Sequence, residues 1–410
     1  MRSLTLILAA ILAVCSSAGI LSETVWQNNE KADRDLCRVL LCDDWQLEDR
    51  AREQLAGVRE EDVQRAIVLF KDLLQRDSQD AYRWADLGEA YADAGQKENA
   101  RYCYDQVLAL APYYANLLLR AANFHFEFGE NKEALAVTAR ILRLTPDYDS
   151  VIFSEYTRLV AQVEDVLRYG LPEDSRAARS WLLFLIEAGR IDDAQRTWNW
   201  VAERSYADDA LAGGYVEFLI RQGRPDWAAS AWSSHLGKRS GDYRQCSYLF
   251  NGGFESELAP SPFDWNLART QGVEVARDCT TAGSGKCSLR IEFAGTQNLG
   301  FAVASQVTFV TPGVYRFHAV IRTESLTTDQ GIRFRISDAE VPVRLDVILG
   351  QFTGTRPWSD IEDDVVVPSG TRLLQVQVIR QRSLRFDNKI GGRAWIDDLR
   401  LEPIGNRSSR

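Results

Sequence analysis

The sequence has little of what several classes of function require. Only three of its 410 residues are histidines, and His125, His235 and His318 are far apart in the chain, which argues against a histidine-rich metal site. Neither half carries the net positive charge that nucleic-acid binding requires. Residues 246–410 contain 19 acidic and 19 basic side chains, so the net charge of −10 belongs entirely to residues 1–245. The composition is otherwise that of an ordinary globular protein.

Familiar catalytic motifs are also missing. The sequence contains no G-x-S-x-G turn, no Walker loop, no H-E-x-x-H and no local cysteine–histidine signature. The two carboxylates of a glycosidase could still lie anywhere in the chain, because their separation in space cannot be read from a sequence. We therefore expect a protein without catalytic residues and keep a glycan-processing enzyme as the less favoured alternative.

The first residues are typical of an export signal. Arg2 precedes the apolar stretch Leu4–Cys15, and the small residues 16–18 follow it. Residues 1–21 can be interpreted as a cleaved signal peptide, as an uncleaved membrane anchor, or as a signal for a lipid anchor on Cys15. Each predicts an exported protein, periplasmic or anchored in the inner membrane and facing the periplasm, with secretion as an alternative. No other segment is long and apolar enough to span a bilayer.

Cysteine usage fits an oxidising compartment. Six of the seven cysteines follow the N-terminal stretch. Cys37 and Cys42, like Cys279 and Cys287, are close enough in sequence for local disulfides, although the sequence leaves the connectivity open. Cys103 is also consistent with a small buried hydrophobic residue. The spacings do not form the paired C-x2-C of a structural zinc site, so we expect no zinc.

A repeat with a period of 34 organises the first half. One unit contains Trp84, Leu87, Gly88, Tyr91, Gly95, Ala100, Tyr104 and Pro112. A shift of 34 gives Leu118, Ala121, Ala122, His125, Gly129, Ala134, Thr138 and Pro146. The second-helix pattern recurs at Gly189, Ala194, Trp198 and again at Gly223, Ala228, Trp232. Residues 149–174 break the period and predict an irregular helical insert or a shortened repeat.

These positions resemble the tetratricopeptide repeat, W-x2-L-G-x2-Y followed by glycine, alanine, an aromatic residue and proline. The resemblance implies an α-solenoid of helical hairpins whose first helices line a concave groove. Trp198 and Trp232 would then belong to the core.

The residues expected to line the groove are polar, and half of them are acidic. In the two best repeats they are Tyr82, Glu89, Asp93, Asn116, Asn123 and Glu127. The family's best-known peptide clamp holds a terminal carboxylate with Lys, Arg and Asn, and only Asn123 matches that set, with Leu119 where a Lys is expected. We therefore expect a basic or neutral segment of a protein partner, with a solvated acidic face and no ligand as the alternative.

The pattern of hydrophobic and polar residues changes after Cys246. Alternating runs such as 313–321 and 373–379 are bounded by turn residues and predict an antiparallel β-sandwich. In the first run Tyr315 and Phe317 face one way while Arg316 and His318 face the other. The predicted parts are an N-terminal segment at 22–58, helical repeats at 59–237, a linker at 238–246, the sandwich at 247–403 and a tail at 404–410.

Ordered landmarks in the second half resemble galactose-binding-like jelly rolls of bacterial carbohydrate-binding modules. The main ones are Asn251-Gly-Gly-Phe-Glu255 at the start and Trp395-Ile-Asp-Asp-Leu399 at the end. The resemblance implies a structural Ca²⁺ held by Glu255 and Asp397 with backbone carbonyls, and Asp398 is the neighbour most easily mistaken for the ligand. The alternative is that both acids lie at the surface at strand ends.

Sugar binding requires flat aromatic rings and forked polar side chains. The candidates are Trp358 and Trp395, with Arg333, Arg335 and Arg380 as polar partners. Trp395 lies inside a fold-defining motif, which favours a packing role for it. The architecture predicts an exported, non-catalytic envelope scaffold with repeats for a protein partner and a sandwich for a glycan, as in polysaccharide assembly or export. A pure protein-interaction scaffold is the alternative.

Overall fold

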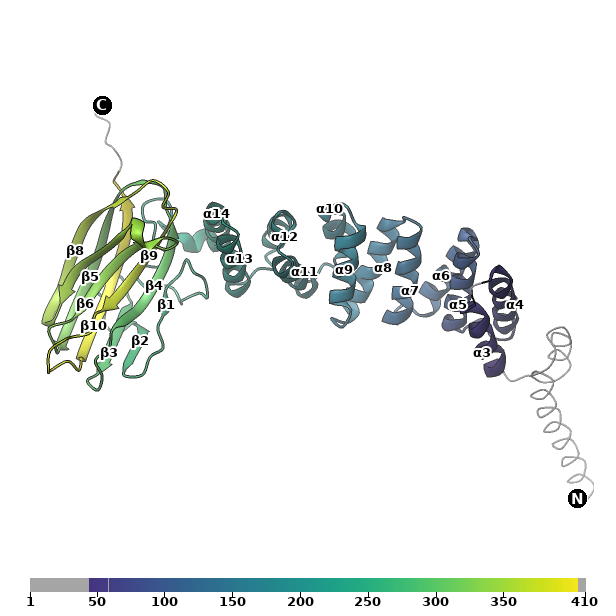
Figure 1. Cartoon of the computed structure of the whole chain (residues 1–410), viewed down its shortest axis with the longest axis horizontal. Coiled ribbons are helices and arrows are strands. Elements are labelled where there is room, and N and C mark those ends of the chain that lie inside the picture. The colour runs from purple at the N-terminus through teal and green to yellow at the C-terminus, as the bar shows by residue number, and fades with distance from the viewer. Residues whose placement is uncertain (1–43, 58, 405–410) are drawn as a thin grey trace, which may run out of the picture. The chain divides into compact units, whose positions relative to one another are not determined.

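The computed structural model describes residues 44–57 and 59–404, which form twelve helices followed by two five-stranded antiparallel sheets (Figure 1). The predicted order, an α-solenoid and then an antiparallel β-sandwich, is confirmed. The export signal, Cys37 and Cys42 lie outside the described residues. Within them, no helix has the length and apolar character needed to cross a membrane. The described residues divide into two compact units, the first ending at Trp181 and the second beginning at Leu182.

The first unit is a series of antiparallel helix pairs. Its helices are α3 (Asp44–Leu55), α4 (Glu60–Arg76), α5 (Ala81–Asp93), α6 (Lys97–Leu110), α7 (Ala115–Glu127), α8 (Asn131–Leu144), α9 (Asp149–Leu159), α10 (Val163–Asp165) and a π-helical turn (Val166–Gly170). The short α9, α10 and π turn are the irregular segment predicted between residues 149 and 174. Helix α11 (Ser175–Glu187) spans the division between the units.

Local chemistry explains where these helices begin and end. The Asp80 carboxylate caps α5 by accepting hydrogen bonds from the backbone N–H groups of Tyr82 and Arg83, at 2.9 and 3.2 Å. Gly95 and Gly129 occupy equivalent positions of successive repeats. They follow α5 and α7 with φ angles of +69° and +70°, which glycine adopts without strain. The repeat is therefore a repeat of backbone conformation as well as of residue type.

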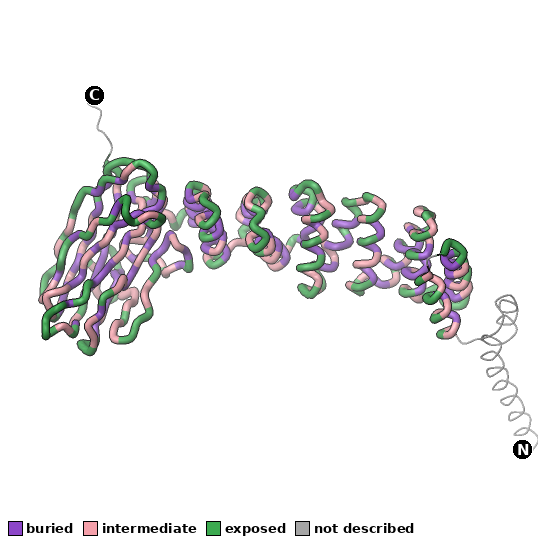
Figure 2. The backbone as a smooth tube through the Cα atoms, viewed as in Figure 1, coloured by how far each residue is buried: buried purple, intermediate pink, exposed green. Residues whose placement is uncertain are grey.

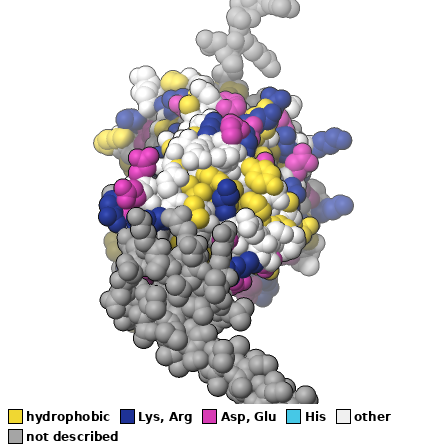
Figure 3. Space-filling view, turned by 90° about the vertical axis from the view of Figure 1, so that its right-hand side faces the viewer, with side chains coloured by type: hydrophobic (Ala, Val, Ile, Leu, Met, Phe, Trp, Pro, Cys, Tyr) yellow, Lys and Arg dark blue, Asp and Glu magenta, His cyan; other side chains and the backbone are white. Residues whose placement is uncertain are grey.

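Small and apolar residues hold neighbouring helices together. A cluster of buried side chains that includes Ala51, Ala66 and Phe70 joins α3, α4 and α5. At the α3–α4 end, Trp45 and Val68 are exposed. Figure 3, which views the molecule from this side, shows several hydrophobic side chains close together, with charged side chains beside and between them.

The second unit begins with the end of α11 and three further helices, α12 (Ile191–Glu203), α13 (Asp209–Arg221) and α14 (Pro225–Leu236). Trp198 and Trp232 are almost completely buried, as the repeat pattern predicts. A 3-10 helix (Gly237–Ser240) follows, and Trp232 of α14 contacts the ring of Phe250 at 5.9 Å between centroids. The domain and linker boundaries given above stay predictions.

The sandwich is made of two sheets with the strand orders β1-β4-β9-β6-β7 and β2-β3-β10-β5-β8. Its strands are β1 (Asn266–Leu267), β2 (Val273–Asp278), β3 (Ser288–Ala294), β4 (Phe301–Phe309), β5 (Gly313–Leu326), β6 (Ile332–Asp338), β7 (Asp346–Phe352), β8 (Gly354–Val367), β9 (Leu373–Arg380) and β10 (Gly391–Pro403). A 3-10 turn, Pro342–Arg344, joins β6 to β7. We call these the β9 sheet and the β10 sheet.

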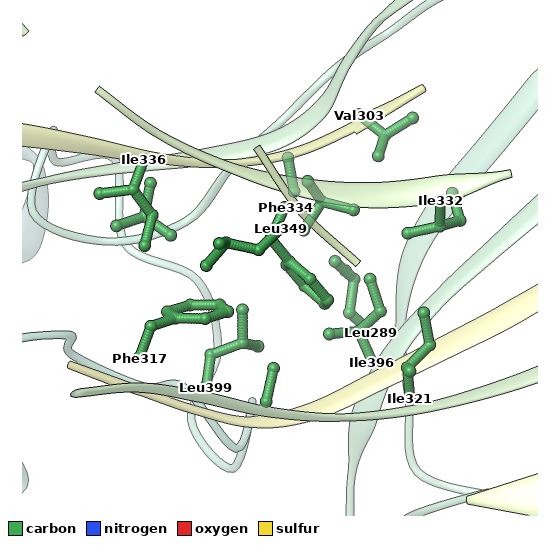
Figure 4. Close-up of a cluster of buried hydrophobic side chains, with 14 of the residues drawn as sticks. Leu289, Val303, Phe317, Ile321, Ile332, Phe334, Ile336, Leu349, Ile396 and Leu399 are labelled. Atoms are coloured by element: carbon green, nitrogen blue, oxygen red, sulfur yellow. The ribbon is translucent and has the colours of Figure 1, made fainter. Parts of the chain in front are cut away.

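The core lies between the two sheets, and burial alternates most clearly along β5, at the centre of the chain's second half (Figure 2). In Figure 4, Phe334 and Leu349 of the β9 sheet meet Phe317 and Ile396 of the β10 sheet. Tyr315 and Phe317 are buried, while Arg316 is exposed. The two orientations predicted for this strand are confirmed. The side chains that alternate with the buried ones point to the outer face of the sheet and remain available for other contacts.

Candidate functional site

The six residues predicted to line the groove lie on the first helices of two neighbouring pairs. All six, on α5 and α7, are exposed: Tyr82, Glu89, Asp93, Asn116, Asn123 and Glu127. The Asn116 side-chain amide donates to the Tyr82 hydroxyl at 3.0 Å, which joins the two helices at positions one repeat apart. The structure therefore brings equivalent positions of successive repeats together on one polar face, which we call the α5–α7 face.

An arginine that the sequence reasoning did not single out organises this face. Arg120 on α7 donates to Glu89 at 2.6 Å and forms an ion pair with Asp86 at 2.8 Å. Arg52 on α3 donates to the same Asp86 at 3.1 Å. Arg52, Asp86 and Arg120 follow one another at the repeat period, so the repeat contained the signal that would have found them. Two arginines thus fix one largely buried carboxylate.

Negative charge remains at one end of the α5–α7 face. Asp93 and Glu127 are equivalent positions of the two repeats, and among the described residues no ion pair neutralises either. Burial raises the pKa of Asp93, and the nearby Glu89 carboxylate raises it further. Like charges gathered in this way favour a cationic ligand.

In the sandwich, a row of side chains crosses the outer face of the β9 sheet. Strand register places Ser305 of β4 beside Gln377 of β9, Gln377 beside Arg335 of β6, and Arg335 beside Ile348 of β7. Arg335 is held by two hydrogen bonds to Asp346, at 2.7 and 2.8 Å. These side chains, apart from Ser305, line an open hollow of about 530 Å³ that Phe301 and Arg382 also border. We call it the β9 hollow.

Arg333 lies on β6 two residues before Arg335. Its guanidinium donates to the Gln351 side chain at 2.5 Å and to the Gln330 side chain at 3.0 Å, while its buried Nε has no hydrogen-bond partner among the described residues. Arg333 and Arg335 are therefore both on the outer face of the β9 sheet. Their fork-shaped groups can hydrogen-bond adjacent hydroxyls.

Arg380 borders the β9 hollow together with Arg335, but unlike the other two arginines its side chain is turned into the sandwich. It is 2% exposed and follows the inward alternation of Leu374, Val376 and Val378. Its guanidinium donates to three backbone carbonyls, of Leu299, Gln330 and Asn388, and to the side chains of Asn298 and Thr328. Burial lowers its pKa. These bonds tie together three loops at one end of the sandwich, a structural use that leaves little of the group for a ligand.

The two tryptophans lie on the opposite sheet. Trp395 is 5% exposed, donates from Nε1 to Asp278 at 2.9 Å, and has the Arg322 guanidinium 5.1 Å from its ring centroid. Trp358 is partly exposed, and a Cβ added to Gly283 would lie 3.1 Å from its ring. The five predicted sugar contacts therefore do not form one site, because the arginines and the tryptophans belong to different sheets.

Glu255 and Asp397, the predicted calcium ligands, approach the same loop. Cys279 and Cys287 close this loop with a disulfide. Asp397 accepts from the N–H groups of Gly283 and Ser284, each at 2.8 Å, and burial raises its pKa. One oxygen of Glu255 accepts from the N–H groups of residues 286 and 287, and the first of these bonds lowers its pKa.

The donor chemistry at this loop suits a hard cation in part. Carboxylate oxygens are present, but among the described residues no group of three acidic, histidine or cysteine side chains could hold a metal. The Arg277 guanidinium donates to the backbone carbonyls of Phe254 and Glu255, at 2.6 and 2.8 Å. Any further ligands would have to be other backbone carbonyls.

Comparison with known proteins gives similarity of fold only. No protein-family model matches the chain, and no curated protein matches it. Over the helical half, the chain is similar to the MamA protein, with 15% identity, coverage of 53% of this chain and 98% of that one, and a TM-score of 0.24.

Over the sandwich, the chain is similar to TmCBM61, solved in complex with β-1,4-galactotriose, with 20% identity, 38% and 98% coverage and a TM-score of 0.28. It is also similar to a xylan-binding domain from CBM 22, with 19% identity, 39% and 96% coverage and a TM-score of 0.27. At identities and scores this low, ligand and partner must be inferred from the residues of this chain.

Proposed function

We propose that this protein is an exported, non-catalytic scaffold of the cell envelope that binds a protein partner through its helical repeats and a glycan through its sandwich. The polar α5–α7 face and the β9 hollow support this assignment, because each presents fixed polar groups without a catalytic arrangement. Such a scaffold would serve the assembly or export of a polysaccharide.

The observation that carries the glycan assignment is the row of Ser305, Gln377 and Arg335 across the outer face of the β9 sheet, in which Gln377 and Arg335 line the β9 hollow. Amide and guanidinium groups are planar hydrogen-bonding groups that match pairs of sugar hydroxyls. Phe301 and Ile348 lie at the same hollow and offer apolar surface to the C–H faces of a sugar ring. An open hollow on a sheet can also accept a chain longer than one sugar.

A glycan array with the whole protein tests this assignment. The double substitution Arg335→Ala and Gln377→Ala removes two polar groups of the hollow and should reduce retention on the bound glycan at least tenfold. Arg316→Ala is the matched control, because Arg316 also forms two hydrogen bonds to an aspartate on the neighbouring strand, on the outer face of the other sheet. If the wild-type protein is retained on no glycan, a pure protein-interaction scaffold becomes the better assignment.

For the protein partner, we propose a basic segment on the α5–α7 face. Charge reversal at Asp93 and Glu127, two exposed acids in equivalent repeat positions, should abolish capture of the partner from an envelope extract. Glu133→Lys is the control, because it reverses one exposed acid on a different helix, α8. Equal capture by both variants would exclude the α5–α7 face.

We further propose that Glu255 and Asp397 hold a Ca²⁺ that fastens the loop 279–287 to the sandwich. Bound Ca²⁺ would add thermal stability, since an ion that binds only the folded state stabilises it. Adding Ca²⁺ after chelation should raise the Tm of the wild-type protein but not of the Asp397→Asn variant. An unchanged Tm of the wild type would leave the two carboxylates as acceptors for loop amides.

The proposed location in the envelope is supported by the apolar stretch Leu4–Cys15 behind Arg2. Cell fractionation should find the protein in the periplasm or the inner membrane. N-terminal sequencing of the mature chain would distinguish cleavage before residue 22 from an uncleaved anchor. Recovery in the cytoplasm would contradict both.

A further inference from the structure

Two large apolar side chains are wholly exposed on one loop of the sandwich. Residues 381–390 connect β9 to β10, and within them Leu384 is 99% and Phe386 is 105% exposed. Single exposed apolar residues are common on protein surfaces. Leu384 and Phe386 differ from such single residues, because they are two positions apart and no protein surface covers either side chain. Neither Leu384 nor Phe386 borders the β9 hollow, although Arg382 of the same loop does.

The loop is held in this conformation by hydrogen bonds on both sides of the exposed pair. On the N-terminal side, the Ser383 N–H donates to Asn298 at 3.0 Å, and the Asn298 amide donates back to the Ser383 carbonyl at 2.8 Å. The Ser383 hydroxyl donates to Asp329 at 2.5 Å. On the C-terminal side, Arg380 donates to the carbonyl of Asn388. These hydrogen bonds therefore hold the loop in a conformation that leaves the two side chains exposed.

Basic side chains surround the exposed pair. Arg382, Arg385 and Lys389 are exposed on the loop and Asp387 is the loop's acid, which gives residues 381–390 a net positive charge within a chain of net charge −10. Arg385 is 77% exposed at its side chain and pairs with Asp329 at 3.4 Å. The loop therefore combines apolar side chains with cationic ones at a single exposed position of the sandwich.

We propose that the loop 381–390 is a membrane-contact loop for an anionic phospholipid surface. Leu384 and Phe386 enter the interfacial region of the bilayer, and Arg382 and Lys389 contact lipid phosphates. Apolar side chains that dip into the headgroup region, flanked by cations, are the two elements that peripheral membrane binding uses. The inference goes beyond the proposed scaffold function and does not depend on glycan binding.

The same surface fits a glycan or a protein less well. Leucine has no flat ring to stack on a sugar, and Phe386 lies on the loop without a facing wall. Protein hot spots are buried residues that fill pockets within a surrounding rim, and they depend on a partner of matching shape. A lipid interface needs only protruding apolar groups and positive charge, both of which the loop supplies.

Insertion can be measured with tryptophan as a depth probe. Phe386→Trp is introduced into the full chain, and its fluorescence is compared with that of the wild type in vesicles of phosphatidylcholine mixed with phosphatidylglycerol as the anionic lipid. Brominated lipids should quench the additional emission, and the emission should shift to shorter wavelength. In pure phosphatidylcholine both effects should fall about tenfold, because each nearby cation contributes to binding of anionic lipid.

Val343→Trp is the matched control. Val343 is 93% exposed in the 3-10 turn that joins β6 to β7. That turn is at the opposite end of β6, since Ile332 pairs with Arg380 whereas Asp338 pairs with Leu374. A tryptophan there should stay unquenched. The N-terminal stretch is identical in both variants, so the difference between them reports the loop.

Serine substitutions test whether the two apolar side chains drive binding. Leu384→Ser with Phe386→Ser should lower vesicle partitioning at least tenfold without changing the Tm, because neither side chain is packed. Equal quenching at positions 343 and 386, or unchanged partitioning of the serine variant, would overturn the proposal. If the serine variant lost glycan retention but kept its vesicle binding, that result would also overturn the proposal and would assign the loop to the β9 hollow.

Discussion

Asp86 and Arg120 are one repeat period apart in the chain, and their charged groups are 2.8 Å apart in space. Arg52, which lies one further period upstream of Asp86, reaches the same carboxylate at 3.1 Å. The period of the sequence is therefore also the spacing of an ion-pair network across three helix pairs.

Asp86→Ala should destabilise the helical unit by roughly 2 kcal/mol, because it leaves two arginines without their largely buried partner. Urea unfolding followed by far-ultraviolet circular dichroism, where helices dominate, measures the loss. Asp93→Ala, on the same helix but exposed, should change stability by less than about 0.5 kcal/mol. Equal effects of the two substitutions would contradict the network.

Adjacent glycines on α13 give a second prediction with an internal control. A Cβ at Gly213 would lie 1.9 Å from the carbonyl oxygen of Pro260, whereas one at Gly214 would meet nothing within 4 Å. Gly213→Ala should therefore destabilise the second unit by about 1–3 kcal/mol. Gly214→Ala should stabilise it by about 0.5–1 kcal/mol, since alanine favours a helix interior. Thermal unfolding of the two variants measures both changes in stability. If both changes had the same sign, the close packing of Gly213 against Pro260 would be contradicted.

The disulfide between Cys279 and Cys287 should contribute about 2–3 kcal/mol, as expected for a short closed loop. Replacing both cysteines by serine should lower the Tm and expose Trp358 to quenching by acrylamide, because the loop then no longer packs on its ring. Cys246→Ser, at an exposed free cysteine, is the control. Wild-type protein under reducing conditions should behave like the double variant, and unchanged quenching would be the contrary result.

Asp264 predicts how stability depends on pH. Burial raises the pKa of this carboxyl to about 6 from an ordinary 3.8, against the lowering effect of the N–H groups of Ala259 and Trp265. Between these two values the folded state binds more protons than the unfolded state, so the contribution of Asp264 to stability falls as pH rises from about 4 to 6.

Above pH 6 the contribution of Asp264 to stability is lost completely. The shift in its pKa corresponds to roughly 3 kcal/mol of unfolding free energy. Asp264→Asn should flatten the dependence in this window even if its stability differs throughout, because an amide does not titrate. Denaturant unfolding of both proteins at several pH values between 3.5 and 7.5 tests this. Parallel curves for the two proteins would show that Asp264 does not titrate in the window.

The repeat could be recognised from sequence because its residues are local and periodic. The spacing alone placed Tyr82 and Asn116 at equivalent positions, and the structure shows them hydrogen-bonded. The same spacing relates Arg52, Asp86 and Arg120, but it does not show that they pair, because pairing across helices depends on side-chain reach and on how closely the helices pack. The acidic face was predicted, whereas the arginine that neutralises part of it was not.

In the sandwich, alternation predicted which side chains face the core but not what covers the outer faces. By alternation Trp395 should face outward, yet it is buried, because Arg322 of the adjacent β5 and Asp278 of β2, two strands away, contact it. Arg380 has the same parity as Leu374, so its inward orientation could have been inferred. Its acceptors could not, because they come from loops up to 82 positions away in the chain.

The bonds of Arg380 have a consequence for genetics. One guanidinium orders the loop that carries Leu384 and Phe386, and Arg382 of the same loop borders the β9 hollow. A screen for loss of function would therefore recover Arg380 among the strongest positions, although its guanidinium is used mainly to order loops. Its phenotype would combine two defects, and only substitutions at the rim, such as Phe386 and Gln377, would separate them.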